Sequence, residues 1–194
     1  MPRPPRHQDS GCYYHVVSRG NNKQIVFDDE LRTLFLHRLG DVAERHSWRV
    51  LAYALMRNHY HLVVKIGTAG LSNGMCELNA WFAKVSNSRF NRIDHCFGRR
   101  FWSANLDTEH YLLMSIRYGM WNPPRAGVCA KPGESTWTSF RASIGLDTPS
   151  AVLAVDDLLA LFHPDRSLAR RALRDFVAEG RVRCQAPWDG PPAT

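Results

Sequence analysis

Short apolar segments alternate along the chain with longer segments in which apolar residues recur at helical spacing. The first apolar segment, Tyr13–Ser18, is rich in aromatic and β-branched residues, which is typical of a strand. From Asp28 to about His46 the apolar residues recur every three or four positions, which predicts a helix. Acidic residues at the start of this segment complement the dipole of such a helix.

Two apolar stretches follow, Trp48–Leu55 and Tyr60–Ile66, and only Met56–Asn58 separates them. So short a link predicts two paired strands. Residues 71–91 place their larger apolar side chains on one side of a helix, and Gly98–Ser103 has the composition of another strand.

A further helix is predicted to begin at Asp107 or Thr108, either of which can cap it, and to run to Asn122. Pro123 and Pro124 should stop it there, because proline lacks the amide hydrogen that a helix needs. Beyond an irregular stretch, a last helical region is expected over about 154–179.

The order of these elements is β, α, β, β, α, β, α. An antiparallel or mixed sheet with helices packed on a face is the natural solution, and the order is compatible with a ferredoxin-like split βαβ arrangement. The sequence therefore predicts an α/β (α+β) fold with a C-terminal helical extension. We divide it into a flexible basic arm (1–12), a main domain (13–148) and the helical extension (149–194).

Composition narrows the class of protein. Of the 194 residues, 44% are hydrophobic, which indicates a globular chain. No apolar run approaches the roughly 18 residues that a membrane helix needs, and the polar N-terminus does not look like a secretory signal, so we expect a cytoplasmic protein with no membrane partner. The five cysteines include no CxxC pair, which argues against a disulfide framework or a zinc knuckle.

The chain is basic, with 25 Lys and Arg against 18 Asp and Glu. Only four of the basic residues are lysines, which leaves 21 arginines. Because arginine forms bidentate hydrogen bonds to phosphate and stacks on bases, this excess of arginine favours a nucleic-acid partner. A genome rich in G and C, which encodes arginine wherever a cation is tolerated, would give the same composition.

The first candidate for chemistry is the pair His59 and His61. Two histidines separated by one residue on a strand point to the same face, so that their rings can converge on one metal ion. Tyr60, Leu62 and Val64 would then face the core. The alternative is a chance His-x-His pattern on a surface strand.

The second candidate is the pair Tyr118 and Asn122, which lie four residues apart and share a helix face. A phenol and an amide oxygen could thus approach the same point. From these residues alone, an ordinary half-buried tyrosine and a helix-capping asparagine are the better explanation of the pattern.

Four segments resemble motifs of the REP-associated tyrosine transposases, a branch of the single-tyrosine HUH transposases. Met56–Leu62 is similar to M-P-N-H-x-H, and Arg117–Gly127 is similar to R-Y-x-x-x-N-P-x-R-A-G. Tyr14–Asn21 resembles Y-H-V-x-x-R-G-N, and Trp137–Phe140 resembles W-S-S-Y. The departures include Arg57 in place of proline and Pro124 in place of valine or leucine, and neither removes a catalytic group.

The resemblance implies roles for these residues. His59 and His61 would bind a divalent metal, Mg²⁺ or Mn²⁺, with Asn122 as an amide third ligand. Tyr118 would be the nucleophile that forms a 5′-phosphotyrosine link to DNA. Residues 13–148 would be the HUH catalytic domain, and the enzyme would cleave and rejoin single-stranded or hairpin DNA at repeated extragenic palindromes. Tyr111, two helical turns before Tyr118, is a competing nucleophile that lacks the flanking motif.

Basic and aromatic residues alternate between positions 89 and 102, which suits binding of single-stranded DNA. The candidate DNA-binding residues there and elsewhere are Arg3, Arg6, Arg19, Arg89, Arg92, Arg99, Arg100, Trp102 and Arg125. When bound to DNA the protein would be associated with the nucleoid, as a monomer or a homodimer. Two other functions stay open, a nucleic-acid-binding protein without catalysis and a metal-dependent phosphodiesterase in which water attacks.

Overall fold

A four-stranded sheet forms the centre of the structure, a computed structural model that describes residues 10–180. Its strands are β1 (Tyr13–Arg19), β2 (Arg49–Leu55), β3 (His59–Lys65) and β4 (Trp102–Asn105). The helices are α1 (Asp29–Arg45), α2 (Ser72–Arg89), α3 (Glu109–Arg125), α4 (Phe140–Ser143), α5 (Val155–Ala160) and α6 (Arg166–Glu179), with short 3-10 turns η1 (Asn21–Lys23) and η2 (Pro132–Glu134).

The strands lie in the order β2-β3-β1-β4, and all three pairings are antiparallel. Because β1 and β3 are central while α1 and α2 connect them to the outer strands, the topology is the ferredoxin-like split βαβ arrangement. The predicted fold class is therefore confirmed.

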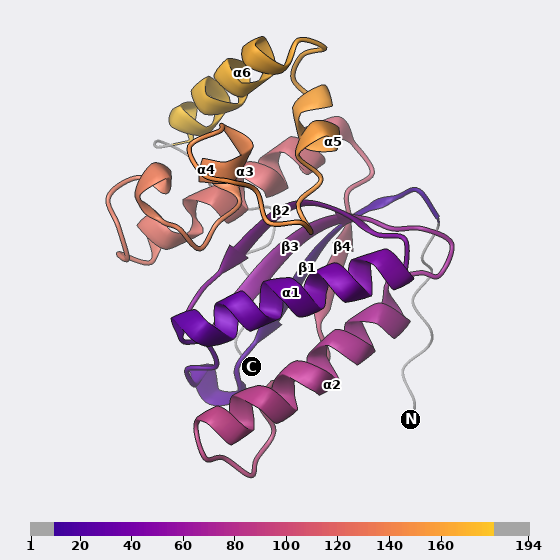
Figure 1. Cartoon of the computed structure of the whole chain (residues 1–194), viewed down its shortest axis with the longest axis vertical. Coiled ribbons are helices and arrows are strands. Elements are labelled where there is room, and N and C mark those ends of the chain that lie inside the picture. The colour runs from indigo at the N-terminus through magenta and orange to yellow at the C-terminus, as the bar shows by residue number, and fades with distance from the viewer. Residues whose placement is uncertain (1–9, 181–194) are drawn as a thin grey trace.

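One face of the sheet carries the hydrophobic core and is covered by α1 and α2 (Figure 1). Tyr60 is fully buried there, with its ring against Phe35 and its hydroxyl donating to Asn79 at 2.6 Å. Leu62 and Val64 follow on the same face of β3 with no exposed surface. The strand alternation read from the sequence is thus correct for this face.

The opposite face of the sheet is covered by α3, which packs on β2 and β3. On β2, Ala52 and Ala54 pair with Val63 and His61 of β3. They therefore lie on the same face of the sheet as the β3 histidines. Their small side chains leave room for a helix to lie close to the sheet. Ile116 and Met120 of α3 are buried in that space.

The outer edge of β2 is covered by later parts of the chain. The Leu55 amide donates to the Trp137 carbonyl at 2.8 Å, and the Ser139 amide donates to the Tyr53 carbonyl at 3.0 Å. Further along, the Ala154 amide donates to the Val50 carbonyl at 2.8 Å. These bonds satisfy backbone groups that an edge strand otherwise offers to other chains.

The described part of the C-terminal extension packs on α3 and β2. Leu158 of α5 and Leu173 of α6 have no exposed surface, and both belong to the same hydrophobic cluster as the sheet. The Trp121 indole on α3 donates to the Val177 carbonyl at 2.7 Å, and the Arg117 guanidinium lies 4.4 Å from the centre of the Phe176 ring. The extension thus stabilises the helix that carries Tyr118.

The prediction that α3 ends at Asn122 is wrong, because the helix continues through both prolines to Arg125. Proline keeps its carbonyl acceptor, and the amides of Gly127 and Val128 donate to Pro124 and Pro123, each at 3.0 Å. The Ala126 amide donates to the Asn122 carbonyl. The missing amides therefore weaken only the last turn, and Asn122 lies inside the helix.

Two other boundaries also differ from the prediction. The fourth strand covers Trp102–Asn105 rather than Gly98–Ser103, where it pairs with the middle of β1. The last helical region is two helices, because Pro164 lies between α5 and α6 and Asp165 caps a new start by accepting from the Leu168 amide at 2.9 Å. Within 10–180, no helix is long and apolar enough to cross a membrane.

Replacing Leu173 tests whether the packing of α6 stabilises the whole protein. Leu173 has no exposed surface, so Leu173→Ala should lower the free energy of unfolding by about 2–5 kcal/mol through lost burial and the cavity left behind. Leu168, on the same helix and 50% exposed, is the matched control, and Leu168→Ala should cost less than about 1 kcal/mol. Urea unfolding followed by circular dichroism measures both. Equal effects would mean that α6 does not share the core.

Candidate active site

Three histidines share the face of the sheet that α3 covers. In the β1–β3 register His61 stands opposite Val17, His59 opposite Arg19 and His15 opposite Val63. All three side chains are buried, and His15 has no exposed surface. The predicted pair on β3 therefore has a third imidazole beside it, contributed by β1.

Asn122 of α3 reaches down between the two predicted ligands. Its side-chain oxygen lies 3.2 Å from Nε2 of His59, and its side-chain nitrogen lies 3.1 Å from Nε2 of His61. Asn122 is itself buried. The amide and the Nε2 atoms of both rings thus converge on one point between the sheet and the helix.

The hydrogen bonding around His59 fits a cation at this point. Asn58 Oδ1, an acceptor, lies 2.6 Å from Nδ1 of His59, so Nδ1 carries the proton of the neutral ring. The lone pair on Nε2 then faces the oxygen of Asn122, which is also an acceptor. A cation bound by both atoms satisfies both lone pairs, and their separation is close to the roughly 3 Å between adjacent ligands of an octahedral ion with bonds of about 2.1 Å.

Burial keeps the three rings neutral, as metal ligands must be. The pKa of His59 is lowered to about 4, chiefly by desolvation and next by the positive charge of Arg19. Desolvation also lowers the pKa of His61 well below its ordinary value, with the neighbouring His15 and His59 adding to the effect. The pKa of His15 falls to about 3 through burial.

Tyr118 lies next to this cluster. Its ring meets the His61 ring edge-on at a centroid distance of 5.4 Å and the His15 ring at 6.1 Å. On its other side, the Arg125 guanidinium lies 5.0 Å from the centre of the Tyr118 ring. Tyr118 is only partly buried, so the phenol is within reach of a bound substrate.

The competing tyrosine, Tyr111, lies in a different environment. It is 42% exposed near the start of α3, and its ring contact is with His110. Among the described residues, no ring contact joins Tyr111 to the histidines of the sheet. The geometry therefore favours Tyr118 over Tyr111.

Three of the predicted DNA-binding residues surround the histidines. Arg19 ends β1 beside His59 and is exposed, and Arg125 covers the Tyr118 ring. Trp102 of β4 meets the His15 ring edge-on at 5.6 Å. These side chains come from separate elements, and the fold brings them to one site.

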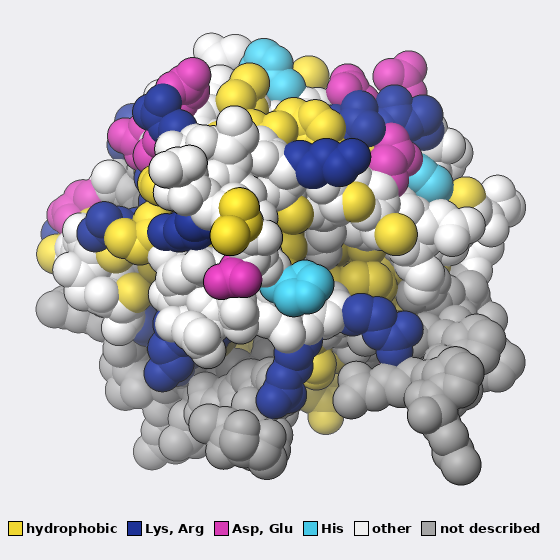
Figure 2. Space-filling model, turned by 90° about the horizontal axis from the view of Figure 1, so that it is seen from below, with side chains coloured by type: hydrophobic (Ala, Val, Ile, Leu, Met, Phe, Trp, Pro, Cys, Tyr) yellow, Lys and Arg dark blue, Asp and Glu magenta, His cyan; other side chains and the backbone are white. Residues whose placement is uncertain are grey.

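Other predicted DNA-binding residues lie elsewhere. Arg89 forms ion pairs with Asp28 at 2.6 Å and Glu30 at 3.2 Å, and Arg92 donates to the Ile25 carbonyl. Arg99 and Arg100 are exposed before β4, while Arg3 and Arg6 lie outside the described residues. Seen from below, Lys and Arg side chains are spread over the surface and several stand beside acidic ones (Figure 2).

Sequence reasoning missed Asn58 and left His15 without a role. Asn58 orients the first histidine through its side-chain oxygen, and His15 contacts the second through a bond of 2.9 Å to Nδ1 of His61. The signal for His15 was present, because it interrupts an otherwise apolar strand as His59 and His61 do. Only the strand pairing shows that the three belong together.

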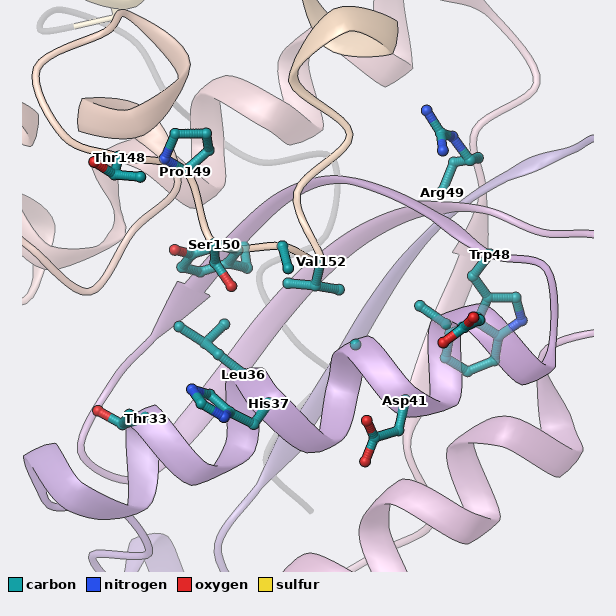
Figure 3. A pocket seen from close by; sticks show the side chains of 15 residues that line it. Thr33, Leu36, His37, Asp41, Trp48, Arg49, Thr148, Pro149, Ser150 and Val152 are labelled. Atoms are coloured by element: carbon teal, nitrogen blue, oxygen red, sulfur yellow. The ribbon is translucent and has the colours of Figure 1, made fainter.

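The described residues include no group of three or more His, Cys, Asp and Glu side chains suited to a metal ion. The candidate set instead combines two histidines with an amide. A separate pocket of about 810 Å³ lies between α1 and residues 148–152, lined by Leu36, Trp48 and Val152 among others (Figure 3). None of the predicted site residues lines it, so this pocket is separate from the candidate active site.

Comparison with known protein families identifies the family of this chain. Residues 8–115, more than half of the chain, match the family model described as IS200-like transposase. The chain belongs to the IS200-like transposase family. The family match gives it the general function of a DNA transposase. No curated protein sequence matches it significantly.

Two solved structures resemble this IS200-like transposase. The structure of a REP-associated tyrosine transposase bound to a REP hairpin matches with a TM-score of 0.65 and 14% identity, over 80% of this chain and 90% of that one. A Deinococcus radiodurans protein described as a candidate transposase matches with a TM-score of 0.42 and 14% identity, over 57% and 88% of the two chains. The first match shows a shared fold.

The single-tyrosine transposase family, to which the predicted branch belongs, is thus confirmed. The matched span of this IS200-like transposase includes the histidine pair of β3 but ends at residue 115, before Tyr118 and Asn122. The family match therefore says nothing of the tyrosine or the amide, whose predicted roles rest on their contacts with the histidines and on their own motif.

Proposed function

We propose that this transposase cleaves and rejoins single-stranded DNA through a covalent 5′-phosphotyrosine intermediate on Tyr118. The observation that carries the proposal is the convergence of His59, His61 and Asn122 beside the Tyr118 ring. Such a reaction needs neutral nitrogen and amide oxygen atoms that can hold a metal ion. It also needs a partly exposed phenol that can attack the phosphate.

The Nε2 atoms of His59 and His61 and the oxygen of Asn122 would hold a divalent cation. Mn²⁺ accepts imidazole more readily than Mg²⁺, which prefers oxygen, and either ion suits a set of this mixed kind. When bound, the ion polarises the scissile phosphate and stabilises the charge that develops on its non-bridging oxygens. The remaining steps depend on side chains of the chain itself.

Tyr118 would act as the nucleophile. Its phenolic oxygen attacks the phosphorus, a bond from that oxygen to phosphorus forms, and the bond from phosphorus to the 3′ oxygen breaks. The phenol loses its proton and the leaving 3′ oxygen gains one, which gives a 5′-phosphotyrosine and a free 3′-OH. Attack by another 3′-OH reverses the step and rejoins DNA, with no external source of energy.

Arg19 and Arg125 would bind the phosphates on either side of the scissile bond. Both lie at the rim of the histidine cluster, Arg19 beside His59 and Arg125 over Tyr118. Trp102, next to His15, offers a ring on which an unpaired base can stack.

The substrate class we propose is a hairpin with single-stranded flanks, of the kind found in repeated extragenic palindromes. Two observations support it, the motifs shared with REP-associated tyrosine transposases and the shared fold with one that is bound to a REP hairpin. Residues 13–148 would form the catalytic domain, and the extension from residue 149 would hold α3 in place. The protein would act on chromosomal DNA at the nucleoid.

Replacing the two tyrosines separately tests the nucleophile. Phenylalanine keeps the ring and removes only the oxygen, so Tyr118→Phe should fold and bind DNA normally yet form no covalent adduct and release no 3′-OH. Tyr111→Phe is the matched control from the same helix and should keep full activity. A denaturing gel of an end-labelled hairpin substrate measures both.

Each other result on that gel identifies a different mechanism. An adduct that persists in Tyr118→Phe and disappears in Tyr111→Phe would assign the nucleophile to Tyr111. Cleavage by all three proteins without any adduct would mean that water attacks, as in a phosphodiesterase. Binding without cleavage under any divalent metal would identify a non-catalytic binding protein.

Replacing His59 tests the metal site. His59→Ala removes one of the converging nitrogen atoms. Loss of the hydrogen-bond partner of a metal ligand costs up to about 100-fold, so loss of the ligand itself should lower cleavage at limiting Mn²⁺ by at least that factor. Hairpin binding should change little, because it depends on arginines. Cleavage at the wild-type rate by His59→Ala would rule out this site. His37→Ala on α1, away from the cluster, is the control.

Salt dependence and two arginine variants test the DNA contacts. Hairpin affinity should exceed duplex affinity and fall as salt rises, because each contact to a phosphate releases counterions. Arg19→Ala should weaken binding and reduce the slope of log affinity against log salt by about one unit. Arg89→Ala, at an arginine already paired with Asp28, should change the slope little. Equal slopes for both variants would contradict the proposed role of Arg19.

A further inference from the structure

His15 is the one imidazole of the cluster that the proposed function does not use. It has no exposed surface, and its Nε2 lies 2.9 Å from Nδ1 of His61. The two rings are nearly parallel, with 23° between their planes and 5.2 Å between their centres. The contact therefore joins the nitrogen of His61 that points away from Asn122 to a neighbouring strand.

The orientation of the Asn122 amide, with its oxygen toward His59 and its nitrogen toward His61, indicates which nitrogen of His61 carries the proton. The Asn122 amide nitrogen lies 3.1 Å from Nε2 of His61 and can only donate, so Nε2 offers a lone pair. The neutral ring then carries its proton on Nδ1, which donates to Nε2 of His15. His15 is thus the acceptor, and its own proton lies on Nδ1.

The same bond sets the direction of the His61 lone pair. A ligating histidine is oriented by the partner of its second nitrogen, and loss of that partner typically weakens metal binding about 10–100-fold. The usual partner is a carboxylate, a carbonyl or a water, and here a buried neutral imidazole stands in its place. A neutral acceptor fixes the ring without adding a negative charge to the site.

Packing holds His15 itself in position. The Trp102 ring meets it edge-on at 5.6 Å with 86° between the planes, and the Tyr118 ring meets it at 6.1 Å with 67°. His15 therefore contacts a ring from β4, a ring from α3 and a ring from β3.

We propose that His15 is a positioning residue, which holds His61 in the tautomer with a free Nε2 lone pair and aims that lone pair at the metal. This inference rests on the proposed function, since it assigns His15 a role toward the ion that His59, His61 and Asn122 would bind. His15 contacts neither the ion nor the DNA in this role.

Nitrogen-15 NMR of the metal-free full-length protein tests the tautomer directly. Long-range proton–nitrogen correlations should show both His61 and His15 protonated on Nδ1. His15→Leu replaces the acceptor with an apolar side chain of similar size. In this variant His61 should change to the Nε2-protonated form or a mixture of the two forms. A wild-type His61 protonated on Nε2 would overturn the proposal without any variant.

Titration with Mn²⁺, followed by electron paramagnetic resonance of the free ion, tests the consequence. His15→Leu should raise the dissociation constant about 10–100-fold. His15→Gln, whose side-chain oxygen can accept from His61 Nδ1, should recover most of that loss, and His15→Asn, which is too short, should not. Val42→Ala, at a buried residue of α1, is the control for lost stability and should bind Mn²⁺ as the wild type does.

A variant of His61 separates the two proposals. If His61→Ala binds Mn²⁺ as tightly as the wild type, the proposed metal site is wrong. If His61→Ala loses Mn²⁺ while His15→Leu keeps it, the metal site stands and the role of His15 is wrong. Equal losses in His15→Leu and His15→Gln would also overturn the role, because the acceptor would then make no difference.

Discussion

The antiparallel register between β1 and β3 is the constraint on which the site depends. It sets Tyr60 opposite Ser18 and His61 opposite Val17, so that each central strand sends alternate residues to α1 and α2 and the others to α3. A slip of one residue would exchange the two faces. It would turn His59 and His61 of β3 toward α1 and α2, and Tyr60, Leu62 and Val64 toward α3. The hydrophobic core therefore fixes the register, and the register fixes which histidines meet.

The second requirement is a helix that lies close to the polar face. Ala52 and Ala54 make this possible because their side chains are short where α3 crosses β2. α3 then supplies Asn122 between the imidazoles and Tyr118 beside them. Buried polar groups are costly unless each finds a partner, and here Asn58, Asn122 and His15 provide partners for the β3 histidines. Packing of α6 against Trp121 and Arg117 holds the helix from behind.

Much of this could be predicted from the sequence, for reasons that differ from element to element. Alternation along Tyr60–Ile66 is a local pattern, so the face on which His59 and His61 lie followed from spacing alone. Helical spacing likewise joined Tyr118 to Asn122. The place of His15 could not be predicted, since it depends on the pairing of strands far apart in the sequence. The end of α3 was misjudged because a proline near the end of a helix costs only the bond that its own amide would form, while its carbonyl still accepts. The ion pair of Arg89 with Asp28 could not be predicted either, because the two residues lie 61 positions apart.

The distribution of charge at the site follows from the same layering. The imidazoles lie under α3 and are neutral because burial lowers their pKa values, whereas the arginines stand at the rim in contact with solvent. A phosphate backbone that approaches the sheet thus meets Arg19 and Arg125 before it meets the histidines. In the proposed reaction the backbone would be held at the rim, with its scissile phosphate between the convergent lone pairs and the phenol of Tyr118. Neutral ligands leave the full charge of a bound cation available to that phosphate, because no carboxylate offsets it. A reaction that must run in both directions benefits from this arrangement, since the same charge stabilises the transition state of cleavage and of rejoining.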